Sequence, residues 1–113
     1  MDQADPRTDG SAAAGDAAAA ETAIEIVDRA DRRRYEMSVD GRLAGIATYE
    51  LGDGEITFIH TEVDRSFAGR GLGLRLAAHV LDDARARNLR VRPLCPFIKR
   101  YIRSHPEYRD LVG

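Results

Sequence analysis

Three alternate glycines at the junction between a strand-like run and a long amphipathic pattern constrain this chain more than any other feature. They are Gly69, Gly71 and Gly73, within residues 63–76. Glycine accepts left-handed backbone and lets successive N–H groups approach a ligand closely. A helix N-terminus behind such a turn adds partial positive charge. The junction therefore predicts an anion-binding turn, with a plain connector as the alternative, because glycine-rich turns also serve as simple links.

Composition divides the 113 residues into a tail and one domain. Residues 1–22 are dominated by Ala, Asp, Gly, Ser and Thr, without an aromatic or branched aliphatic side chain, so we expect a disordered tail there. Residues 23–113 should form the folded domain. The tail holds five acidic residues and one basic residue, so the net charge of −2 becomes about +2 for the domain. This small excess suits a small anionic ligand.

Several function classes are disfavoured by the same composition. Arg32, Arg33 and Arg34 form the densest basic cluster, but they fall at an expected turn and lack the stacking aromatics of a nucleic-acid surface. The single cysteine excludes an internal disulfide. The N-terminus has no basic and apolar secretion pattern, and no apolar run approaches the ~18 residues of a membrane span. We therefore expect a cytoplasmic protein that binds neither nucleic acid nor membrane.

The first half of the domain has the pattern of an antiparallel sheet. Residues 23–28, 35–39, 42–51 and 55–64 are rich in β-branched residues or alternate between apolar and polar, and Asp40-Gly41 is a strong hairpin signal. Parallel neighbours would need a crossover of about a dozen residues, which these short connections do not allow. Four consecutive strands in an antiparallel meander are predicted.

The period then changes to that of helices. An apolar stripe at helical spacing predicts a helix over residues 71–88, packed on the sheet by one face; it consists of Leu72, Leu76, Ala77, Val80, Leu81 and Ala84. Residues 90–95 read as a fifth strand, parallel to the fourth after this crossover. Pro93 cannot donate to a sheet, so strands four and five should splay near their ends. Pro96 opens a second helix to residue 104, and residues 107–112 form a last turn.

This arrangement resembles the GNAT superfamily, the acetyl-CoA-dependent N-acetyltransferases. The resemblance rests on the meander, the Ala68-Gly69-Arg70-Gly71-Leu72-Gly73 turn, and the segments His60-Thr61-Glu62-Val63, Leu94-Cys95-Pro96-Phe97 and His105-Pro106-Glu107-Tyr108. The Cys-Pro-Phe segment is similar to that of a minimal, single-domain subfamily. The resemblance implies an α+β fold with a mixed five-stranded sheet, and an acceptor side left open because no helices fit between the first two strands.

The resemblance also implies an activity, acetyl transfer from acetyl-CoA to a primary amine of a small molecule or lysine, without a metal. The coenzyme would lie between strands four and five, on Val63 and on the glycine turn formed by Gly69, Arg70, Gly71, Leu72 and Gly73. Ala68 stands where the family usually has Arg or Gln, which removes one side-chain contact. Tyr101 matches the tyrosine that protonates the leaving coenzyme in many members.

Three further side chains are candidates for the chemistry. His60 and Glu62 alternate onto one face of strand four, so either could accept the amine proton. Cys95 stands at the N-terminus of the second helix, where the helix dipole favours a thiolate, so it is either an acetyl-accepting nucleophile or a buried small side chain.

Other classes of protein remain to be weighed. A non-catalytic module that binds coenzyme A or a protein partner is the alternative to an enzyme. A dinucleotide-binding domain is disfavoured because Leu74 stands where its fingerprint needs glycine, and a nucleoside triphosphate loop would need Gly-Lys-Ser/Thr.

Overall fold

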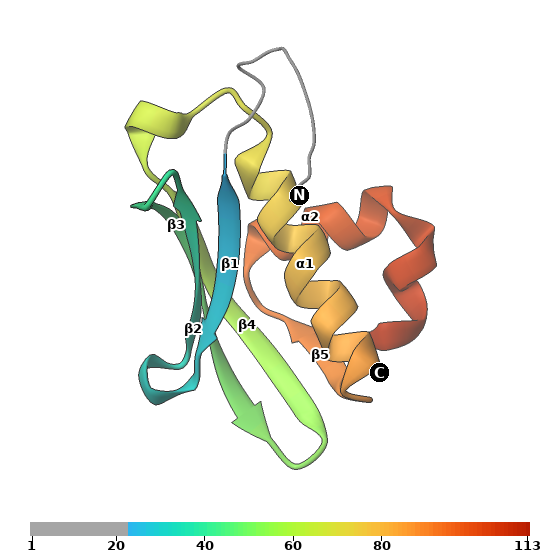
Figure 1. The fold of residues 1–113 in the computed structure, drawn as a ribbon. Helices are drawn as coiled ribbons and strands as arrows, with labels where there is room; N and C mark the ends of the chain where they lie inside the picture. Colours follow the sequence, from blue (N-terminus) through green and yellow to red (C-terminus); the bar gives the residue numbers. More distant parts are fainter. Residues whose placement is uncertain (1–22) are drawn as a thin grey trace, which may run out of the picture.

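The computed structural model describes residues 23–113, and the predicted 1–22 tail lies outside the described residues. The described part contains a five-stranded sheet with helices on one side (Figure 1). In chain order the elements are β1 (Ile24–Arg29), the 3-10 turn η2 (Ala30–Arg32), β2 (Arg34–Val39), β3 (Arg42–Gly52), β4 (Glu55–Val63), η3 (Arg65–Phe67), α1 (Leu72–Ala86), β5 (Arg90–Pro93), α2 (Pro96–Ser104) and η4 (Pro106–Leu111). At most of the element ends, these bounds lie within two residues of the predicted ones.

The strands stand in chain order across the sheet. The pairs β1–β2, β2–β3 and β3–β4 are antiparallel, and β4–β5 is parallel. The predicted meander with a parallel fifth strand is therefore confirmed. The connection from β1 to β2 is only the η2 turn and Arg33, which takes a left-handed φ of 54°. No helix stands between these two strands.

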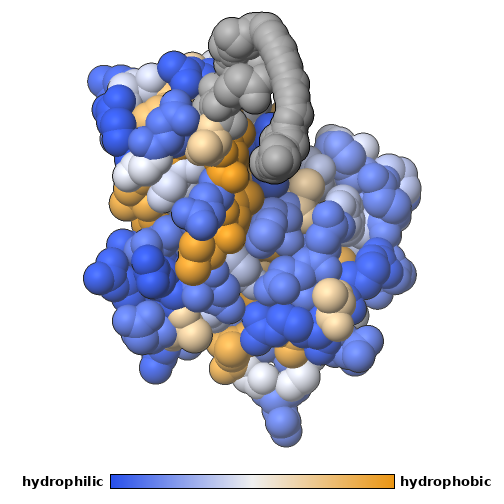
Figure 2. Space-filling model, in the orientation of Figure 1, coloured by the Kyte–Doolittle hydropathy of each residue, from blue (hydrophilic) through white to orange (hydrophobic). Residues whose placement is uncertain are grey.

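The core lies between the sheet and α1. All six residues of the predicted apolar stripe of α1 are buried, and they meet Tyr35, Met37 and Phe58 of the sheet. Figure 2 shows apolar side chains along β1, where Ile24 and Ile26 pack partly buried against this core. Within residues 23–113, the opposite face of the sheet, called here the open face, carries no α-helix (Figure 1).

The pairing of β4 with β5 ends at Phe58 and Pro93. Beyond this point the carbonyl of Phe58 accepts hydrogen bonds from the N–H groups of both Leu94 and Cys95, at 3.0 and 2.9 Å. The β5 chain thereby turns away into α2, while β4 continues to Val63 without a β5 neighbour. The predicted splay is confirmed, and it leaves a stretch of β4 backbone free on that edge.

A β-bulge in β4 decides which way its last side chains point. Thr48 of β3 pairs with His60 and Tyr49 pairs with Phe58, so Ile59 is the extra residue. Because side chains alternate along a strand, one extra residue exchanges the two faces. Thr61 and Val63 therefore turn toward the helices, and Glu62 turns to the open face.

Tyrosine hydroxyls bonded to aspartates link β3 to β1 within the sheet and η4 to α1 in the helix layer. Tyr49 donates to Asp28 at 2.5 Å, and Tyr108 of η4 donates to Asp82 of α1 at 2.7 Å. Burial is the larger cause, and the hydrogen bond to an aspartate is the second; together they raise the pKa of Tyr49 and of Tyr108 to about 12. Their protonated forms are thus favoured in the folded state.

We predict that the free energy of unfolding falls as pH rises from about 10 to about 12. In this window the unfolded chain has already released its tyrosine protons while folded Tyr49 and Tyr108 keep theirs, so the unfolded state binds fewer protons and is favoured. Urea unfolding across this pH range measures the effect. Tyr49→Phe should show a shallower decline, and an unchanged slope in that variant would contradict the assignment.

Candidate active site

The glycine turn forms the N-terminus of α1. Gly69 and Gly71 have φ of 81° and 71°, and Gly71 is the N-cap residue. The first helical bond runs from the Arg75 N–H to the Gly71 carbonyl, at 3.2 Å. The N–H groups of the first turn before Arg75 have no acceptor within the helix. Such a terminus attracts anions.

Gly73 has a different role from the other two glycines. It lies inside the first turn of α1, where a Cβ would meet Phe97 Cζ at 3.1 Å and Val63 Cγ2 at 3.5 Å. Glycine at this position lets α1 pack closely against the side chains of α2 and β4. The sequence interpretation, which assigned all three glycines to the anion-binding backbone, missed this packing role.

Two arginines flank the aromatic ring beneath the turn. The guanidinium carbons of Arg42 and Arg70 lie 5.1 and 5.4 Å from the centre of the Phe67 ring, which is buried. Cation–π contact holds both charges near the glycine turn. Arg42 was missed as a candidate, although the antiparallel register of β3 and β4 sets the start of β3 beside the end of β4.

Cys95 lies at the start of α2 as predicted, and its thiol is buried. The thiol donates to the Thr61 hydroxyl across the splay, with 3.4 Å between Sγ and Oγ1. In the described structure the Cys95 sulfur makes no capping hydrogen bond to the N–H groups at the start of α2. The Cys95 carbonyl accepts the Lys99 N–H at 2.9 Å. The sulfur thus faces β4 across the space between the unpaired part of β4, residues 59–63, and the start of α2, called here the gap.

Tyr101 lies six residues after Cys95, nearly two turns along α2, and is half-buried. Its ring stacks on His105, with 3.8 Å between ring centres, and His105 Nδ1 donates to the Tyr101 carbonyl at 2.8 Å. Burial raises the pKa of Tyr101, and the carboxylates of Glu107 and Asp82 add to the increase. The phenol is therefore held protonated, as a proton donor must be.

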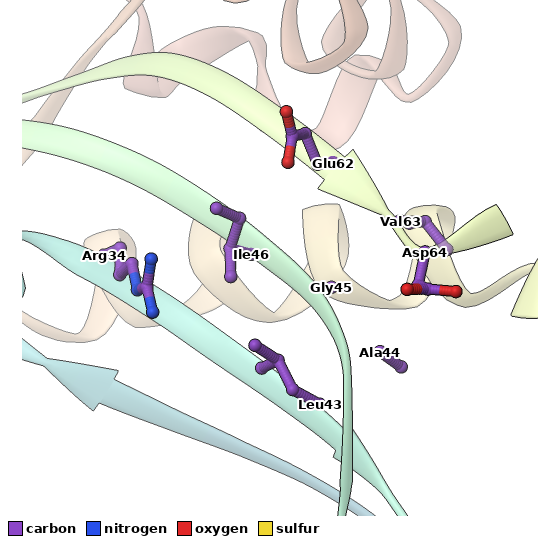
Figure 3. Close-up of a pocket in the computed structure, with 8 residues that line it drawn as sticks. All are labelled: Arg34, Leu43, Ala44, Gly45, Ile46, Glu62, Val63 and Asp64. Carbon is purple, nitrogen blue, oxygen red and sulfur yellow. The ribbon is translucent and has the colours of Figure 1, made fainter.

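His60 and Glu62 lie together on the open face. His60 Nε2 is 3.0 Å from Glu62 Oε2, and both side chains are more than half exposed. Glu62 borders a pocket of about 410 Å³ that is formed by the ends of β3 and β4 together with Arg34 of β2 (Figure 3). Ile46 lies between Arg34 and Glu62 in that view.

The candidate residues thus fall into two groups by layer, one on each side of β4, and within the helix layer the described ring contacts of Tyr101 are with His105 and Tyr108, whereas Cys95 contacts Thr61. Cys95 and Tyr101 come from the helix layer, whereas His60 and Glu62 face away from it. From Ile59 onward the edge of β4 has no β5 partner.

Within residues 23–113, no cluster of three His, Cys, Asp or Glu side chains is close enough to hold a metal ion. The helices of the same segment are too short or too polar to cross a membrane.

Comparison with known proteins identifies relatives of this chain. The human protein NATD1 is 33% identical over 102 residues, which cover 85% of this chain and 88% of the human one. NATD1 of Xenopus tropicalis is 33% identical over 82 residues, covering 67% and 73% of the two chains. A solution NMR structure from Staphylococcus aureus, described as GCN5-like, superimposes with a TM-score of 0.61 at 26% identity, covering 79% of this chain and 87% of that one.

Residues 34–111 match the family model of the GCN5-related N-acetyltransferases. The matched segment runs from β2 to η4 and includes the glycine turn, the gap and both groups of candidate residues. By sequence and by fold, the chain belongs to the GCN5-related N-acetyltransferase family.

Proposed function

We propose that this chain transfers an acetyl group from acetyl-CoA to a primary amine. Family membership indicates acyl transfer in general, and the family generally uses acetyl-CoA. The observation that carries the finer proposal is the gap between β4 and β5, which opens at Phe58 and has the glycine turn at the far end of its free strand. A long thioester with a charged end fits a free strand edge that leads to an anion-binding turn.

The chain offers suitable partners for both ends of this co-substrate. The N–H groups of Gly69, Arg70, Gly71, Leu72 and Gly73 would hold the pyrophosphate, and the guanidinium groups of Arg42 and Arg70 add positive charge. These two arginines supply the charge that Ala68 lacks. The free backbone edge of β4 up to Val63 would pair with the amides of the pantetheine arm. When bound, acetyl-CoA supplies an acyl carbon activated by its sulfur leaving group.

The two groups of side chains suit the two proton movements that the reaction needs. The amine loses a proton as its nitrogen bonds to the acyl carbon, and the sulfur gains one as the carbon–sulfur bond breaks. We propose that Glu62, with His60 beside it, takes the amine proton on the open face. Tyr101, whose pKa is raised by burial, would protonate the sulfur from the helix side.

Cys95 allows a second route, in which its thiol carries the acetyl group before the amine. We favour direct attack by the amine, because the described partner of this buried thiol is the Thr61 hydroxyl, which is not a base. In this proposal Cys95 lines the gap beside the acyl carbon.

Saturating acetyl-CoA is expected to raise the free energy of unfolding by about 2.7 kcal/mol at a hundred times its Kd. Gly71→Ala should lose much of this gain, because alanine is strained at the φ of 71° that shapes the turn. Gly52→Ala is the matched control, since a Cβ there meets nothing within 4 Å and lies far from the turn. Equal stabilisation of both variants would remove the glycine turn from the binding site.

Turnover separates an enzyme from a non-catalytic coenzyme-binding module. We expect thiol release from acetyl-CoA in the presence of a panel of primary amines, and Tyr101→Phe should lower the rate by about a hundredfold while leaving acetyl-CoA binding intact. Stabilisation by acetyl-CoA without turnover on any amine would favour the module.

Incubation with acetyl-CoA in the absence of an amine tests the role of Cys95. Mass spectrometry of the protein incubated with acetyl-CoA alone should find no acetyl group on the thiol if the amine attacks directly. An acetylated Cys95 that decays on addition of amine would establish the covalent route instead.

A further inference from the structure

The open-face pocket beside Glu62 has opposite charges on its two sides. On one side Arg34 donates to Glu36 Oε2 from Nη2 at 2.7 Å and from Nε at 2.8 Å. Arg29 and Arg32 also pair with Glu36, each at 3.3 Å. Three guanidinium groups thus share one carboxylate, which leaves this side, called here the basic rim, with surplus positive charge.

The other side of the pocket is acidic. Glu62 borders the pocket, and its described partner is the His60 ring, with 3.0 Å between His60 Nε2 and Glu62 Oε2. Asp64 also lines this side, and its hydrogen bonds from the Ser66 hydroxyl and N–H lower the pKa of its carboxyl group. The Asp64 carboxylate is therefore favoured in its charged form.

An apolar surface separates the two sides. The sheet register aligns Glu36, Ile46 and Glu62 on neighbouring strands, so Ile46 stands between the basic rim and the acidic side. Leu43 lines the same pocket and is half exposed (Figure 3). Strands lie about 4.8 Å apart, which sets the backbones of Glu36 and Glu62 roughly 10 Å apart.

We propose that the acceptor is an amino carboxylate, with its amine at Glu62, its carboxylate at Arg34 and an apolar segment over Ile46. This inference rests on the proposed acetyltransferase function and specifies its substrate class. A simple alkylamine would leave the surplus positive charge of the basic rim unmatched beyond Glu36, and a polycation would be repelled by that charge. A ligand with both charges satisfies the two sides at once.

Three amines of matched length test this substrate class: ε-aminocaproate, its uncharged amide, and n-pentylamine. With acetyl-CoA saturating, we expect kcat/KM for ε-aminocaproate to exceed the values for the other two by about tenfold or more. Arg34→Gln should abolish the preference by lowering only the rate on ε-aminocaproate, and Arg34→Lys should restore part of it.

Arg33→Gln is the matched control. Arg33 neighbours Arg34 in sequence but pairs with Glu50 at 3.7 Å and does not line the pocket, so this variant should keep the preference. Thermal unfolding of each variant verifies that the sheet is intact. Loss of the preference in Arg33→Gln to the same degree would show a diffuse charge effect and overturn the assignment to Arg34.

The rates on the three amines distinguish an error in the amino carboxylate assignment from an error in the proposed acetyltransferase function. Equal rates on all three amines would overturn the amino carboxylate assignment while acetyl transfer stands. Acetyl-CoA binding without turnover on any of the three, or on the wider amine panel, would overturn both together.

Discussion

The end of the parallel pairing between β4 and β5 is the constraint on which the site depends. The Phe58 carbonyl accepts from two successive N–H groups, and Pro93 has none to offer, so the ladder cannot continue. Beyond this point the chain continues into α2, which brings Cys95 to one side of the gap, opposite Thr61 of β4. The free edge of β4 leads to the glycine turn, where Gly73 lets α1 approach Phe97 and Val63 closely.

The bulge at Ile59 supplies the second constraint, because it gives the gap two chemically different sides. Without it, Glu62 would point into the helix layer with Phe58, and a carboxylate would be buried there at high cost. With it, Glu62 and His60 reach solvent and the pocket next to Arg34, while Thr61 turns inward to the Cys95 thiol. The acid and the base proposed for acetyl transfer are thereby kept apart.

Much of this fold was predictable because its local signals agree with one another. The Asp40-Gly41 hairpin, the stripe of α1 and the pair Pro93 and Pro96 each specify local backbone. The family resemblance indicated that the fifth strand borders the coenzyme site. The bulge was not predictable, since no residue in β4 demands it and it arises from pairing with β3. Arg34 and Arg42 were missed for the same reason: their neighbours are distant in sequence, and only the strand register brings them to the site.

The central claim, that coenzyme A occupies the gap from the free edge of β4 to the glycine turn, is tested most directly by amide NMR. Isotope-labelled protein is titrated with coenzyme A, which binds without turnover. The largest shift changes should fall on the glycine turn from Gly69 to Gly73 and on β4 from Thr61 to Val63. Changes confined to β1 and β2, or none at concentrations that saturate related enzymes, would contradict the claim.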